Sequence, residues 1–172
     1  MRRRRFLIPF SIFLVSLAAL ERADASNDHF VVLGPSVGFA TGGDLETAAL
    51  LSVDLSYAFM TSEPARSFIP NIKHLFWLSG GCRFLFQEEH IYLPYVEVGG
   101  WWILNLGVGY TAAVNGPEAL GDHFFHAFVG APLPVPLLFE KIPLLVEPYY
   151  RPAFGERVLH EAGLLIKYAA EI

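Results

Sequence analysis

Cysteine is almost absent from this sequence, since Cys82 is the only one among 172 residues. A single cysteine cannot form an intramolecular disulfide, so no disulfide framework holds the fold together. No cysteine stands directly after the apolar run at the N-terminus either, and this excludes a lipoprotein anchor.

Charge is also scarce, and positive charge is scarcer than negative. Charged residues make up 17% of the chain, whereas ordinary soluble domains have about 25%. Five of the twelve basic residues and two of the seventeen acidic ones precede Ser26, which leaves seven basic residues against fifteen acidic ones beyond that point. Binding of nucleic acid needs a basic surface, so nucleic acid is excluded as a partner.

The N-terminus has the layout of an export signal. Four arginines precede an apolar run over residues 6–20, and small residues stand at Ala23 and Ala25. We predict that residues 1–25 are a cleaved signal peptide of a Gram-negative bacterial protein, exported by the general secretory route, and that residues 26–172 form one domain. The alternatives are an uncleaved membrane anchor and a twin-arginine signal.

Beyond the signal, no second apolar run of helical length occurs, and a period of two recurs instead. In residues 46–60, Leu51, Val53 and Leu55 alternate with Ser52 and Asp54. Such alternation predicts an extended strand with two different faces. Eight segments follow this pattern, at residues 29–40, 46–60, 74–87, 90–100, 101–113, 122–131, 143–154 and 160–169.

The charged residues near the middle of these segments share the face that also carries glycine and serine. They are three acids and three bases: Asp54, Arg83, Glu97, Glu147, Arg151 and Lys167. A narrow closed barrel requires such a balance, because its interior is filled by side chains and buried charges are tolerated when paired. We therefore predict that these six residues form an ion-pair network that plugs a lumen. The alternative is a solvated polar face whose charges balance by chance.

The opposite face of the eight segments is apolar, and the sequence supplies no helix or second sheet to cover it. Lipid would cover such a face. The predicted fold is therefore all-β, an eight-stranded antiparallel up-and-down transmembrane β-barrel. A secreted soluble lipocalin-like barrel or a β-sandwich is the alternative.

This pattern, from His29 to Tyr168, resembles the small eight-stranded outer-membrane barrels of the outer-membrane protein A and X type. The resemblance implies a place in the bacterial outer membrane, with both termini in the periplasm and with outer-membrane lipid and the barrel-assembly machinery as partners. The sequence departs from that type at its C-terminus, because Tyr168 is followed by four further residues instead of ending the chain. Residues 61–72 and 132–142 are also long for periplasmic turns.

Residues with catalytic or metal-binding chemistry are few. His123 and His126 are three apart, which places them on opposite faces of a strand, so we expect no metal site. No serine stands at a motif spacing from His126 or His160, and no nucleophile elbow occurs. We expect no catalytic residue and no cofactor, and a non-enzymatic structural or surface-interaction role. A lipid-modifying outer-membrane enzyme is the alternative.

Four short acidic connections are the candidate exposed loops. They are Thr41–Glu46, Glu88–His90, Val114–Asp122 and Gly155–His160. Loops this short argue against a large adhesive surface, and no specific protein or ligand partner follows from them.

Overall fold

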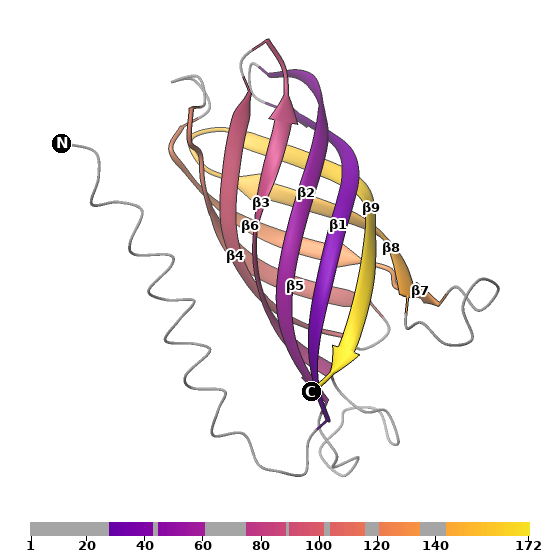
Figure 1. Ribbon diagram of the computed structural model, residues 1–172. Helices are drawn as coiled ribbons and strands as arrows, with labels where there is room; N and C mark the ends of the chain where they lie inside the picture. Colours follow the sequence, from indigo (N-terminus) through magenta and orange to yellow (C-terminus); the bar gives the residue numbers. More distant parts are fainter. Residues whose placement is uncertain are drawn as a thin grey trace.

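The computed structural model describes residues 28–42, 45–60, 75–88, 90–101, 104–115, 121–134 and 144–172 (Figure 1). The predicted signal peptide, residues 1–25, lies outside this part of the chain. The strands are β1 (Asp28–Gly42), β2 (Leu45–Met60), β3 (Leu75–Phe86), β4 (Ile91–Trp101), β5 (Asn105–Ala112), β6 (His123–Gly130), β7 (Leu133–Pro134), β8 (Leu144–Phe154) and β9 (Val158–Glu171). In the described ranges, no helix has the length and apolar character needed to cross a membrane.

The strands form one antiparallel sheet that closes on itself. Its order is β6-β5-β4-β3-β2-β1-β9-β8-β7, and an additional pairing between β6 and β8 completes the ring. The two-residue β7 only extends one edge of β8, so the barrel wall consists of eight long strands. This arrangement confirms the prediction of an eight-stranded antiparallel up-and-down barrel.

The ring is least regular where β6 meets β8. Residues pair there at four positions, Phe125 with Phe154, His126 with Ala153, Val129 with Tyr150 and Gly130 with Tyr149. The gap in this ladder lies opposite Pro152, which has no N–H to donate. The ladder between β1 and β9, the first and last strands, also skips Gly34 and Pro35, but it pairs at ten positions.

Predicted and observed strands agree closely except at β4 and β5. We expected one strand over residues 101–113, but Trp101 belongs to β4 and pairs with Asn105 at the start of β5. The run Trp-Trp-Ile-Leu at residues 101–104 contains no polar residue, Gly or Pro, so no signal in the sequence marks a boundary between two strands there.

The barrel has two different ends. At the terminal end, β1 begins and β9 finishes, as the lower part of Figure 1 shows. At the turn end, the opposite one, β1 connects to β2, β3 to β4, β5 to β6 and β8 to β9. All four predicted exposed loops connect strands at the turn end, whereas the longer segments 61–74 and 135–143 connect strands at the terminal end.

The outward face is apolar on every long strand. Large apolar side chains exposed there include Leu33, Val53, Phe76, Val98, Val108, Phe125, Phe154 and Ile166. In the described strands, no Asp, Glu, Lys or Arg takes an outward position. The period of two read from the sequence thus separates an exposed apolar face from an enclosed face, because neighbouring side chains of a strand point to opposite sides.

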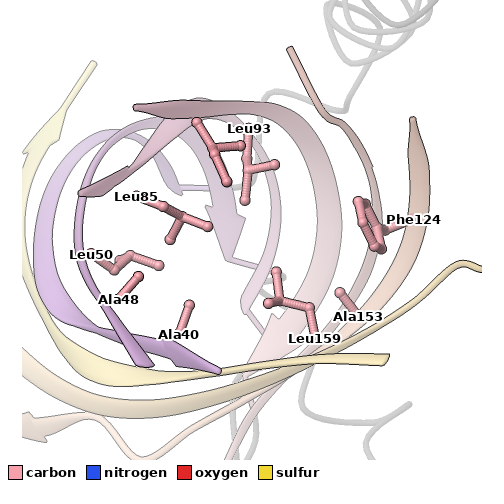
Figure 2. Packing of buried hydrophobic residues seen from close by; sticks show 9 residues of the cluster. Ala40, Ala48, Leu50, Leu85, Leu93, Phe124, Ala153 and Leu159 are labelled. Atoms are coloured by element: carbon pink, nitrogen blue, oxygen red, sulfur yellow. The ribbon is translucent and has the colours of Figure 1, made fainter. Parts of the chain in front are cut away.

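The turn-end half of the lumen is filled by an apolar cluster, which we call the apolar seal. Its buried members come from β1, β2, β3, β4, β6, β8 and β9: Ala40, Ala48, Leu50, Leu85, Ile91, Leu93, Phe124, Ala153 and Leu159. Figure 2 shows these side chains inside the ring of strands, pointing toward one another. The polar residues that were predicted to plug the lumen therefore share it with an apolar cluster, which the sequence analysis did not predict.

Candidate functional site in the barrel lumen

A closed cycle of polar side chains crosses the lumen below the apolar seal. Glu161 accepts hydrogen bonds from Arg83 Nη1 at 2.6 Å and from Arg151 Nη1 at 3.4 Å. Arg151 Nε also donates to Glu97 Oε2 at 3.0 Å, and His126 Nε2 lies 2.7 Å from the same oxygen.

Thr111 closes this cycle between His126 and Arg83. Its Oγ1 lies 2.9 Å from His126 Nδ1 and accepts a hydrogen bond from Arg83 Nη2. We call these six residues the polar ring: Arg83, Glu97, Thr111, His126, Arg151 and Glu161. They come from six different strands, and all are buried. Charges removed from water in this way are stable only when each one has partners, and the cycle provides them.

The two remaining long strands join the polar ring through Tyr95. The Tyr95 ring lies 4.3 Å from Arg83 Cζ and 5.1 Å from Arg151 Cζ, within the range of cation–π attraction. Its hydroxyl donates to Asp54 of β2, which also accepts from Ser52 at 3.2 Å. Ser52 lies 2.6 Å from Ser36 of β1. Every long strand therefore contributes a polar group to this layer.

Glu147 and Lys167 lie apart from the polar ring, nearer the terminal end. Lys167 Nζ is 2.5 Å from Glu147 Oε2, an ion pair whose angles do not meet hydrogen-bond geometry. Glu147 is fully buried, whereas the Lys167 side chain is 19% exposed. Among the described residues, no donor reaches Glu147 Oε1. This carboxylate thus has one ionic partner and unused hydrogen-bonding capacity.

The structure places all six predicted lumen residues on the inward face but divides them into three groups. Arg83, Glu97 and Arg151 belong to the polar ring, and Glu147 and Lys167 form their own pair. Asp54 forms no ion pair within 4 Å in the described part of the chain, so the expected ionic partner is replaced by two hydroxyl groups, those of Tyr95 and Ser52.

Sequence reasoning missed three members of the polar ring, Thr111, His126 and Glu161. Glu161 lies inside the predicted segment 160–169 and shares the face of Gly163 and Lys167, but the inward face of that segment was read only from Gly163 onward. His126 was placed on the inward face but considered only for catalysis and metal binding. Extending the alternation by one step would have found Glu161. The contact between His126 and Glu97 depends on the stagger of distant strands.

Below the polar ring, the lumen holds a cavity of about 190 Å³ that extends to the terminal end. Its apolar wall includes Val32, Trp77, Phe128 and Leu165, and its polar wall includes Asp54, Glu97, Glu147, Arg151 and Lys167. Met60, Trp101 and Ala169 border it near the end of the barrel. The lumen is thus closed at one end and hollow at the other.

Small inward residues give the large ones room. A Cβ at Gly99 or Gly107 would overlap the ring of Trp77, whose Nε1 donates to Asn105 Oδ1 at 2.6 Å. A Cβ at Gly130 would overlap the carboxylate of Glu147. Glycine is required at these positions because of close side-chain approach.

The other histidines of the described strands lie on the outward face, each against a tyrosine. Tyr57 Oη is 2.6 Å from His29 Nδ1, and Tyr110 and Tyr150 make equivalent contacts with His123 and His160 at 2.6 and 2.7 Å. No group of three or more potential metal ligands occurs in the described residues.

A closed ring of eight antiparallel strands around a lumen filled largely by side chains is the arrangement of the smallest membrane barrels. The chain has the architecture of a small outer-membrane-type β-barrel. No protein-family model matches it, and no curated protein matches it in sequence.

Solved structures resemble this chain only distantly. Neisserial surface protein A is 10% identical, with 81% of this chain and 96% of that chain covered and a TM-score of 0.46. A de novo designed transmembrane β-barrel is 16% identical, with 82% and 95% covered and a TM-score of 0.42. Ail of Yersinia pestis, solved in complex with the heparin analogue sucrose octasulfate, is 10% identical, with 84% and 99% covered and a TM-score of 0.28.

Proposed function

We propose that this protein is a non-enzymatic structural barrel of the bacterial outer membrane, with a lumen that passes no solutes. The observation that carries the proposal is the outward face. Every long strand exposes large apolar side chains there, and no charged residue takes an outward position in the described strands. In water such a belt would promote association, whereas a bilayer covers it.

Aromatic pairs near both ends of this belt support the proposal. The rings of Phe59 and Phe76 are stacked with centroids 5.5 Å apart near the terminal end. Tyr110 with His123, and Tyr150 with His160, form stacked pairs nearer the turn end. Amphipathic rings favour the headgroup layer, so these pairs would lie at the two membrane surfaces.

A structural role is supported by the turn end. If both termini lie in the periplasm, the cell surface carries only the four shorter connections, which offer little area for adhesion.

The contacts of the histidines agree with a non-enzymatic role. In the described residues, His126 bonds to Thr111 and Glu97, and no histidine is hydrogen-bonded to a serine that could act as a nucleophile. Outer-membrane lipid and the barrel-assembly machinery are the partners this role requires.

A pair of identical substitutions at two depths tests the membrane location. Val108 lies in the middle of β5 and is 62% exposed, whereas Val158 is the first residue of β9. In lipid, Val108→Arg should cost about 2 to 4 kcal/mol and Val158→Arg about 0 to 1 kcal/mol. Urea unfolding in lipid vesicles measures both.

In a soluble barrel both positions would face water, and the two arginine variants would have nearly equal stability. Fractionation gives the second arm of the experiment. The wild-type chain should sediment with outer membranes and migrate differently on gels before and after heating. Recovery in the soluble periplasmic fraction would refute the proposal.

A further inference from the structure

The charged groups that border the terminal-end cavity differ in whether a ligand can reach them. Both carboxylate oxygens of Glu147 are buried, and Oε1 lies against the backbone of Gly130. The Lys167 side chain is 19% exposed, and its Nζ keeps accessible surface and forms no hydrogen bond with the described residues. An ammonium group has three donors, and the ionic contact with Glu147 Oε2 leaves at least two of them for a ligand.

The inner polar groups of the cavity already have partners within the protein. Asp54 accepts from two hydroxyl groups, and Glu97 accepts from Arg151 at 3.0 Å. Buried polar groups of this kind are satisfied without a ligand. Lys167 is therefore the group best placed to hold a polar atom of a ligand, and that atom must be an acceptor, because an ammonium group only donates.

The charge balance of the lumen favours an uncharged acceptor. In the described strands, four carboxylates are enclosed with three permanent cations: Asp54, Glu97, Glu147 and Glu161 with Arg83, Arg151 and Lys167. A bound anion would add to this negative excess, or create one if His126 is protonated, and unbalanced enclosed charge is costly. A cation would be repelled by Lys167 and cannot reach Glu147.

The apolar wall defines the rest of the ligand. Trp77, Phe128 and Leu165 border the cavity, and Lys167 Nζ lies 5.8 Å from the centroids of both aromatic rings. A molecule whose polar atom contacts Nζ therefore places its apolar part against these rings. The volume of about 190 Å³ exceeds that of an apolar cavity of about 150 Å³ known to hold benzene, so there is room for one ring and a short chain.

We propose that this cavity binds a small uncharged apolar molecule with one carbonyl oxygen, which accepts a hydrogen bond from Lys167 while the apolar body lies against Trp77 and Phe128. A carbonyl group suits the site because it has no donor that the apolar wall would leave unpaired. The ligand enters and leaves at the terminal end, because the polar ring and the apolar seal lie across the other side. The site is thus a blind pocket, which agrees with a lumen that passes no solutes.

Four probes of nearly the same shape test this preference on the wild-type protein in lipid nanodiscs. They are acetophenone, its hydrocarbon counterpart 2-phenylpropene, benzoate and benzamidinium. Binding is followed by NMR through the indole N–H signal of Trp77, which borders the cavity and is assigned by its loss in Trp77→Phe. Both uncharged probes should shift this signal, and each charged probe should bind at least about tenfold more weakly than acetophenone.

Lys167→Met removes the donors and keeps the length of the side chain. Comparison of the ketone with the hydrocarbon in each variant cancels their different partition into lipid. The affinity of acetophenone relative to 2-phenylpropene should fall at least about tenfold, the loss expected for one hydrogen bond to a charged group. Because this variant leaves Glu147 unpaired, Lys167→Met is also combined with Glu147→Gln, where the same fall should occur. Glu156→Gln, in the exposed β8–β9 turn at the other end, should change neither affinity.

An unchanged relative affinity in the Lys167 variants would overturn the proposal. Tightest binding of benzoate, or no shift of the Trp77 signal with acetophenone, would overturn it as well. If neither Lys167 variant folds, as reported by heat-modifiable gel mobility, the carbonyl stretching band of bound acetophenone decides on the wild-type protein. A band at lower frequency than in empty nanodiscs shows the hydrogen bond that the proposal requires, and an unshifted band refutes it.

Discussion

The two halves of the lumen are built on the same eight strands but are filled differently. In the turn-end half, inward positions carry Leu50, Leu85, Leu93 and Phe124, which belong to one buried apolar cluster. In the terminal-end half, many inward positions carry small residues, and a cavity remains. The strand number is the same for both halves, so side-chain size at the inward positions determines whether the lumen is closed. A barrel of this width can thus combine a sealed end and a hollow end.

The largest difference between the halves should come from removing buried charges. Glu161→Leu leaves Arg83 and Arg151 without their shared carboxylate and should cost about 3 to 5 kcal/mol of unfolding free energy. Glu147→Leu leaves only Lys167, which is partly exposed, so its cost should be clearly smaller. Urea unfolding in lipid vesicles compares them, and equal costs would mean that water reaches both sites.

A double-mutant cycle sharpens this result. Arg83→Met combined with Glu161→Leu should cost less than the sum of the single substitutions, because the double variant leaves fewer unpaired charges. Coupling below about 0.5 kcal/mol, the level at which separate sites simply add, would show that this pair is not enclosed.

Truncation of leucine should distinguish the halves next. Leu85→Ala creates a void inside the apolar seal and should cost about 2 to 5 kcal/mol. Leu145→Ala enlarges a cavity that already exists and should cost about 1 kcal/mol. The same unfolding measurement applies to both. A larger loss at Leu145 would contradict the assignment of the seal to the turn-end half.

The smallest effects should come from two serines four residues apart on β2. Ser52 donates to the buried Asp54 at 3.2 Å, so Ser52→Ala should cost about 1 to 2 kcal/mol. Ser56 donates to Ser79 at 3.0 Å beside the cavity, so Ser56→Ala should cost about 0.5 kcal/mol. Equal unfolding midpoints for these two variants would show that the polar layer is no tighter than the cavity wall.

Much of the fold follows from the sequence because one physical rule governs every strand. An outward side chain meets a different environment from its inward neighbour, so a period of two persists along each segment. The inward placement of Asp54, Arg83 and Lys167 follows from this rule. The start of β5 does not, since the connection before Asn105 is apolar and carries none of the usual turn residues.

The interior contacts could not be predicted from alternation alone. Alternation assigns Glu97 and Arg151 to the lumen but gives no height for either residue along the barrel. Their contact at 3.0 Å joins β4 with β8 across the lumen and depends on the stagger of the whole sheet. The division of the lumen into a seal and a cavity is hidden for the same reason, since Leu85 and Ser79 share one face of β3.

The interrupted ladder between β6 and β8 determines where the barrel is weakest. A closed wall opens at the contact with the fewest backbone hydrogen bonds, and here that contact lies inside the chain rather than between the first and last strands. The stacked rings of Phe128 and Tyr149, with centroids 5.8 Å apart, join the two strands from within. Amide protons of β6 and β8 should therefore exchange with solvent before those of β1 and β9. The contact between these two lumen side chains thus holds β6 against β8 where the backbone pairing is weakest.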